Sequence, residues 1–132
     1  MDVDEYIRQI RHYREQADQY DEDSPGALME KIRLLTDAHM LMGRVSAQKE
    51  GDYAKIHVLR DNIDAEARAT AKRGEKEISA ARATADLRMA EAEALEQKMI
   101  WKNELNSVKE KIYELRLKVR VDLHITGGGV HG

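Results

Sequence analysis

The chain has 132 residues, of which 36% are charged, and its formal net charge at pH 7 is −3. It contains no cysteine, which excludes disulfide bonds and thiolate chemistry, and no apolar run approaches the roughly 20 residues that a membrane span requires. Aromatic residues are too scarce for a large globular core, whereas the second half is rich in Ala, Glu, Lys, Leu and Arg, as long helices and coiled coils are. We therefore predict an all-α protein, an elongated helical hairpin or bundle with one long, coiled-coil-like C-terminal helix.

Residues 1–23 are predicted to form an acidic N-terminal helix, because they contain eight acidic and only three basic residues. Within them an apolar stripe at helical spacing predicts a helix from about Asp4 to Gln19; its members are Val3, Tyr6, Ile10, Tyr13, Ala17 and Tyr20. The acidic start is unlike a secretory signal peptide, and we expect a cytoplasmic protein.

Residues 24–126 are predicted to form the helical domain. Ser24 followed by Pro25 is a helix-start signal, since Ser accepts a hydrogen bond from a free backbone N–H and Pro suits the first helical position. An apolar seam follows, formed by Leu28, Ile32, Leu35, Ala38 or His39, Met42 and Val45. Gly43 and Gly51 weaken this helix, and we expect a kink or break near residues 49–52. Apolar spacing resumes over residues 53–67, and residues 72–76 are predicted to form a loop in which Gly74 ends the preceding helix.

The last helix is predicted over about residues 77–120. Its early seam is mostly small and consists of Ala80, Ala83, Leu87, Ala90 and Ala94. Its late seam is large, and we predict that it forms an oligomer interface of six residues: Trp101, Leu105, Val108, Ile112, Leu115 and Val119. Periodicity does not distinguish this from packing against the earlier helices of the same chain.

The C-terminal end has a different pattern. Apolar and polar residues alternate over residues 119–126, which is compatible with a short β-strand or with the fraying end of the helix. Residues 127–132 are predicted to be a flexible, Gly-rich tail.

Catalytic signatures are missing. The chain has no Gly-rich phosphate loop and no nucleophile elbow. It has five histidines, and no two of them have the i, i+4 spacing that places both imidazoles on one helix face; they are His12, His39, His57, His124 and His131. We expect no metal, no cofactor and no enzymatic activity.

A basic flank adjoins the late seam of the last helix. At about 100° per residue it gathers Lys98, Lys102, Lys109, Tyr113, Arg116 and Arg120. Cations that neutralise phosphates, beside a ring that stacks on a base, are what sequence-tolerant binding of single strands requires. In an oligomer this flank would join Lys72, Arg73 and Lys76. The alternative is that these cations lie along the seam and pair with acidic residues of a neighbouring helix.

Residues 41–121 also carry a series of short elements in a recognisable order: Gly51-Asp52-Tyr53-Ala54-Lys55, Ala65 to Lys72, Ala90-Glu91-Ala92-Glu93-Ala94, Trp101-Lys102-Asn103, and Leu115-Arg116 before Arg120. This layout resembles that of phage recombination mediators, small helical proteins encoded in the replication and recombination modules of tailed phages. The resemblance implies a ring-forming protein of the host cytoplasm that binds single-stranded DNA and helps to load a recombinase. It also implies that Lys72, Arg73, Arg116 and Arg120 contact the DNA.

Three functions are thus open. The first is a single-strand DNA-binding accessory protein or recombination mediator. The second is a phage inhibitor that binds a host protein such as a defence nuclease, with carboxylates in place of phosphates, for which Asp18, Asp21, Glu22 and Asp23 are the candidates. The third is a structural protein whose self-association is its function. We expect a homo-oligomer, with single-stranded DNA or a host or phage protein as the alternative further partners, and no membrane partner.

Overall fold

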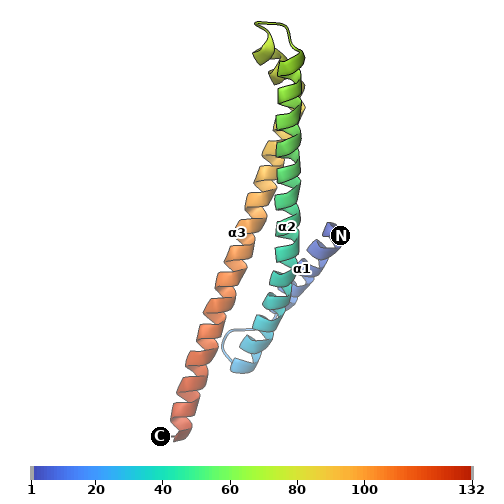
Figure 1. Cartoon of the computed structure of the whole chain (residues 1–132). Helices are drawn as coiled ribbons and strands as arrows, with labels where there is room; N and C mark the ends of the chain where they lie inside the picture. The colour runs from blue at the N-terminus through green and yellow to red at the C-terminus, as the bar shows by residue number, and fades with distance from the viewer. Residues whose placement is uncertain (1, 132) are drawn as a thin grey trace. The chain divides into compact units, whose positions relative to one another are not determined.

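The computed structural model describes the backbone of residues 2–131 and the side chains of residues 2–122. Within these residues the chain consists of three helices and no strand: α1 (Val3–Ala17), α2 (Pro25–Thr70) and α3 (Lys76–His131) (Figure 1). The predicted all-α fold with a long C-terminal helix is therefore confirmed. The chain divides into two compact units. Unit 1 contains the residues up to Val45 and those from Lys102 onward, and unit 2 contains Ser46–Trp101.

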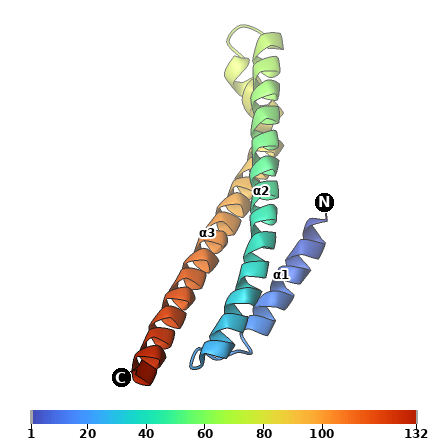
Figure 2. The same cartoon turned by 60° about the horizontal axis from the view of Figure 1, so that its bottom comes forward.

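In unit 1, α1 lies antiparallel beside the N-terminal part of α2 (Figure 2). Both helices begin at capped ends. The Asp2 carboxylate accepts a hydrogen bond from the backbone N–H of Glu5 at 3.2 Å, and this satisfies a donor that has no partner inside the helix. Ser24 does the same for α2, because its hydroxyl accepts from the N–H of Ala27 at 3.4 Å. The predicted start at Ser24-Pro25 is confirmed.

The core of unit 1 comes from all three helices. Among its described side chains eleven apolar residues are buried: Ile10, Ala17, Leu28, Leu34, Leu35, Ala38, Met42, Val45, Val108, Ile112 and Leu115. Polar contacts also join α1 to the other two helices of unit 1. Arg14 of α1 forms an ion pair with Glu104 of α3 at 3.2 Å, and the guanidinium of Arg44 on α2 lies 5.6 Å from the ring centroid of Tyr6 on α1. Unit 1 is thus a three-helix bundle in which the C-terminal part of α3 supplies one wall.

Unit 2 is an antiparallel hairpin of the second part of α2 and the first part of α3. Only Ala80 and Thr84 are buried in it. The Thr84 hydroxyl donates to the carbonyl of Ala80 at 2.8 Å. Because the helix itself satisfies this hydroxyl, Thr84 can occupy a buried position, whereas Ala83, which we predicted for the seam, is exposed.

The turn of unit 2 joins Thr70 to Lys76. The N–H of Glu75 donates to the carbonyl of Lys72 at 3.0 Å, and Gly74 has a φ of 89°. A positive φ at the third residue of a four-residue turn is costly for a residue with a Cβ and is readily adopted by Gly. The predicted loop is confirmed, although Gly74 lies within the turn and not directly at the end of α2.

The predicted break near residues 49–52 is not found. Helix α2 continues through residues 49–52, with Gly43 and Gly51 in its interior. Each Gly costs only about 1 kcal/mol in a helix, which is less than the loss of several backbone hydrogen bonds at a break. At the other end, residues 119–126 belong to α3, so helix and not strand is found there. The helix also extends over residues 127–131, where we predicted a tail, and Gly132 lies outside the described residues.

Candidate nucleic-acid interface

The basic stripe consists of five exposed side chains on one flank of α3: Lys102, Lys109, Tyr113, Arg116 and Arg120. Steps of seven, four, three and four residues bring them to one face of a helix with about 3.6 residues per turn. All five belong to unit 1 and extend along ~27 Å of helix axis, at about 1.5 Å per residue. The structure thus presents a continuous row of cations with one ring inside it.

The cations of this stripe form no ion pair with any carboxylate whose side chain the structure describes. The other flank of the same helix segment behaves differently. There Lys111 pairs with Glu22 at 3.3 Å, and Glu104 pairs with Arg14. The alternative stated above, that basic residues beside the seam pair with acids of a neighbouring helix, therefore describes the far flank. The basic stripe keeps its charge unneutralised within the described side chains.

Tyr113 gives the stripe its aromatic surface. Its side chain is 56% exposed, and the Lys109 ammonium lies 5.9 Å from the ring centroid. The ring borders a hollow of about 370 Å³ that Asn106, Lys109 and Glu110 also line. This combination offers a stacking surface, an amide for hydrogen bonding and a cation, while the Glu110 carboxylate repels a phosphate at that edge.

Four further cations predicted for the interface lie in unit 2. Lys72, Arg73 and Lys76 are exposed at and beside the turn, where they form a separate basic group. Lys98 is half-buried, and its ammonium lies 4.9 Å from the ring centroid of Tyr53. Because this cation is already engaged by a ring of α2, it is not part of the exposed basic stripe.

The six residues predicted for an oligomer interface divide into two groups. Val108, Ile112 and Leu115 are buried within the single chain, and Trp101, Leu105 and Val119 are half-buried. The buried three have no surface left for a second copy, because α1 and α2 of the same unit supply the rest of their core. Packing within the chain, which we gave as the second possibility, accounts for these three.

A charged cluster between the helices of unit 2 was missed by the sequence reasoning. Glu91 of α3, whose side chain is 17% exposed, accepts from Nδ1 of His57 at 3.2 Å and contacts Nε of Arg60. The hydrogen bond from His57 is the main influence that lowers the pKa of Glu91. Together with the charge of Arg60 it outweighs partial burial, which would raise that pKa. His57 and Arg60 are three residues apart and so share a helix face, but nothing local pointed to Glu91.

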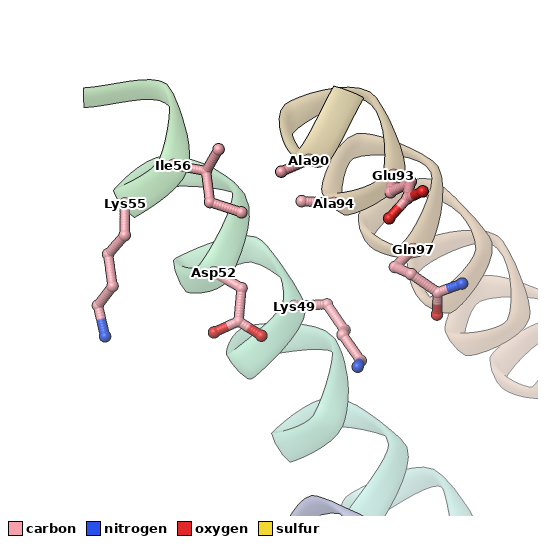
Figure 3. A pocket seen from close by; sticks show the side chains of 8 residues that line it. All are labelled: Lys49, Asp52, Lys55, Ile56, Ala90, Glu93, Ala94 and Gln97. Atoms are coloured by element: carbon pink, nitrogen blue, oxygen red, sulfur yellow. The ribbon is translucent and has the colours of Figure 1, made fainter. Parts of the chain in front are cut away.

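A groove lies on another side of the unit 2 hairpin (Figure 3). Its volume is about 490 Å³, and its lining comes from both helices: Lys49, Asp52, Lys55, Ile56, Ala90, Glu93, Ala94 and Gln97. Figure 3 shows Ile56 and Ala90 facing the space between the helices, while Lys55 points away from it. The lining combines two carboxylates, Asp52 and Glu93, with two lysines and three apolar side chains.

His12, His39 and His57, whose side chains the structure describes, do not assemble a metal site. No group of three or more potential ligands exists among the described side chains, and His124 and His131 lie outside them. In the same part of the chain no helix combines the length and the apolar character needed to cross a membrane.

The acidic side chains before α2 are only partly available to a binding partner. Glu22 is half-buried and bridges Lys31 at 3.4 Å and Lys111 at 3.3 Å. Burial alone would raise its pKa, but the contacts with these two lysines prevail and lower it. Asp18, Asp21 and Asp23 are exposed. Of the four carboxylates predicted to imitate phosphates, Glu22 is therefore a structural bridge within unit 1.

No family model, curated protein or solved structure matches this chain.

Proposed function

We propose that the chain is a binding protein, not an enzyme, and that it holds a single-stranded nucleic acid along the basic stripe of α3. One observation supports this most directly. The stripe is exposed and lacks acidic partners among the described side chains, although Lys111 on the opposite flank of the same helix is paired with Glu22. A row of unpaired cations carries an electrostatic cost that a polyanion removes on binding.

The dimensions of the stripe suit a flexible strand. Its four cations and one ring extend over ~27 Å along a straight helix, so several consecutive phosphates can approach it while one base stacks on Tyr113. A single strand adjusts its path to such a row, and stacking on a ring tolerates any base. We therefore expect weak sequence preference. The layout shared with phage recombination mediators makes single-stranded DNA the first ligand to test.

The net charge of −3 lowers the expected affinity for a nucleic acid. A chain with excess negative charge binds polyanions weakly except where cations gather locally. If all four cations contact phosphates, the logarithm of the association constant falls with the logarithm of salt concentration with a slope of about −2.8 for a single strand. Binding should therefore be measurable at low salt and nearly lost at high salt.

The test uses fluorescence anisotropy of a labelled oligo(dT) strand at several salt concentrations. Arg116→Glu/Arg120→Glu reverses two charges of the stripe and should abolish binding at low salt. The matched control is Arg11→Glu/Lys55→Glu, which changes the net charge equally at two exposed positions away from the stripe. Far-UV circular dichroism verifies that both variants remain folded. Equal affinities of the two variants would disprove the assignment.

Tyr113 provides a second, independent readout. Tyr113→Ala should weaken binding by roughly 5- to 100-fold, because stacking on one base contributes about 1–3 kcal/mol. Tyr113→Phe keeps the ring and should bind as the unaltered chain does. The salt dependence should stay the same in both variants, since neither removes a cation. A Tyr113→Ala variant with full affinity would show that the strand does not stack there.

A further inference from the structure

Helix α3 carries a second, mainly apolar row in unit 2, distinct from the face that packs on α2; Arg88 is its one charged member. The row, which we call the second seam, follows alternating steps of three and four residues: Ile78, Ala81, Ala85, Arg88, Ala92, Leu95 and Met99. This is an a/d heptad pattern over three heptads. Every one of its residues is exposed, including Ile78 at 57% and Met99 at 54%. Single exposed apolar residues are ordinary, but a heptad row of them marks an interaction surface.

We propose that the second seam packs against the second seam of another copy of this chain, antiparallel and centred close to residue 90. In that register each a or d residue of the second seam lies opposite the residue whose number adds with its own to 180, and the facing residues that follow d positions add to 178. Ala81 then faces Met99 of the other copy, and Ala85 faces Leu95. In these two layers a small residue meets a large one, which lets side chains interdigitate. A parallel pair would instead place Arg88 against the same Arg88 in the other copy and would leave Ala81 facing Ala81.

The charges beside the second seam complement each other in the same register. Arg82 and Glu96 both lie at the position that follows the d residue of its heptad, and in an antiparallel pair these positions face each other. Arg82 of each copy therefore forms an ion pair with Glu96 of the other copy, and this ion pair occurs twice by symmetry. Both side chains are exposed, and neither forms an ion pair within the described side chains. In a parallel pair Glu91 would approach Glu96, and like charges would meet.

The second seam and the basic stripe belong to different units, and this inference does not rest on nucleic-acid binding. It differs from the interface predicted from the sequence, whose central residues are buried within unit 1. The second seam accounts for three of the large exposed apolar side chains of unit 2: Ile78, Leu95 and Met99.

A charge-swap experiment tests the register, with mass in solution measured by analytical ultracentrifugation at low salt. The unaltered chain should form dimers. Arg82→Glu and Glu96→Arg should each weaken the dimer about tenfold, because each places like charges opposite each other twice. The double variant Arg82→Glu/Glu96→Arg should restore it. Glu93→Arg is the matched control, since Glu93 is exposed on the same helix outside the second seam.

Cross-linking gives the orientation directly, because the chain has no cysteine of its own. Met89→Cys places thiols of the two copies ~3 Å apart along the axis in the proposed register, so a short bis-maleimide should join them. Ile78→Cys places them ~36 Å apart, so it should give no cross-linked dimer. Efficient cross-linking of Ile78→Cys would overturn the antiparallel arrangement.

The remaining outcomes are equally decisive. A monomer at all concentrations, or a dimer that neither single charge reversal weakens, would overturn the proposal. Arg116→Glu/Arg120→Glu should leave the dimer intact, so failure to bind DNA and failure to dimerise would be recognised separately.

Discussion

Replacing Leu115 with Ala tests whether the late seam of α3 is a core of the single chain. Leu115 is fully buried in unit 1. The substitution removes three carbon atoms, which corresponds to about 2.4 kcal/mol of lost transfer free energy at about 0.8 kcal/mol per group. The cavity left between the three helices adds to this loss, because helices on several sides prevent complete collapse. We therefore expect the free energy of unfolding to fall by about 3–4 kcal/mol.

The assay is urea unfolding followed by far-UV circular dichroism, at a low and a high protein concentration. Leu117→Ala is the control, because Leu117 lies two residues further along α3 and is 60% exposed; its effect should stay within about 0.5 kcal/mol. If Leu115 is buried by its own chain, the loss is the same at both concentrations. A loss that vanishes at the low concentration would show that Leu115 is buried between copies, and would refute the reasoning.

Three other substitutions test local features of the helices. Gly51→Ala should raise the free energy of unfolding by about 1 kcal/mol, because an added Cβ has no atom within 4 Å and Ala favours the helix interior; a decrease in urea unfolding would indicate a break in α2 after all. Ser24→Ala should lower the free energy of unfolding by about 1 kcal/mol through loss of the helix cap. An unchanged unfolding midpoint would contradict the capping role of the Ser24 hydroxyl. Glu91→Gln should weaken the dependence of the free energy of unfolding on pH in the acidic range. The pKa of Glu91 is lowered in the folded chain, so its carboxylate stabilises the fold above the ordinary pKa of 4.5, and this contribution is lost as pH falls through the lower folded value. Thermal unfolding as a function of pH measures the effect, and identical profiles for the two chains would show that the contacts of Glu91 with His57 and Arg60 contribute no stability.

The sequence predicted the features that depend on neighbouring residues. The start of α2 at Ser24 and Pro25, the buried positions of unit 1 except Leu34, and the turn at Gly74 follow from capping, helical periodicity and backbone freedom, and each of these is a local property. The continuity of α2 past Gly51 was not predicted, because a Gly penalty was weighed without the hydrogen bonds that a break would lose.

The contacts between helices could be predicted less well. Helix α3 has two apolar rows in unit 2, and periodicity does not tell which one faces α2. The sequence favoured Ala83, yet the chain buries Thr84 one position further along. The cluster at Glu91 also required knowing that residues 57 and 91 lie side by side, and no spacing along the chain contains that information. For the basic stripe, the residues were predicted, but only the structure revealed that their acidic partners are missing among the described side chains.

The unequal cores of the two units have a consequence for the motion of the backbone. Unit 1 buries eleven apolar residues and unit 2 only Ala80 together with Thr84, although α2 and α3 pass through both units without interruption. Local opening follows the density of buried contacts. Amide protons of residues 46–70 and 76–101 should therefore exchange with solvent well before those around Leu28 and Leu115, so that one continuous helix contains a slowly and a rapidly exchanging half.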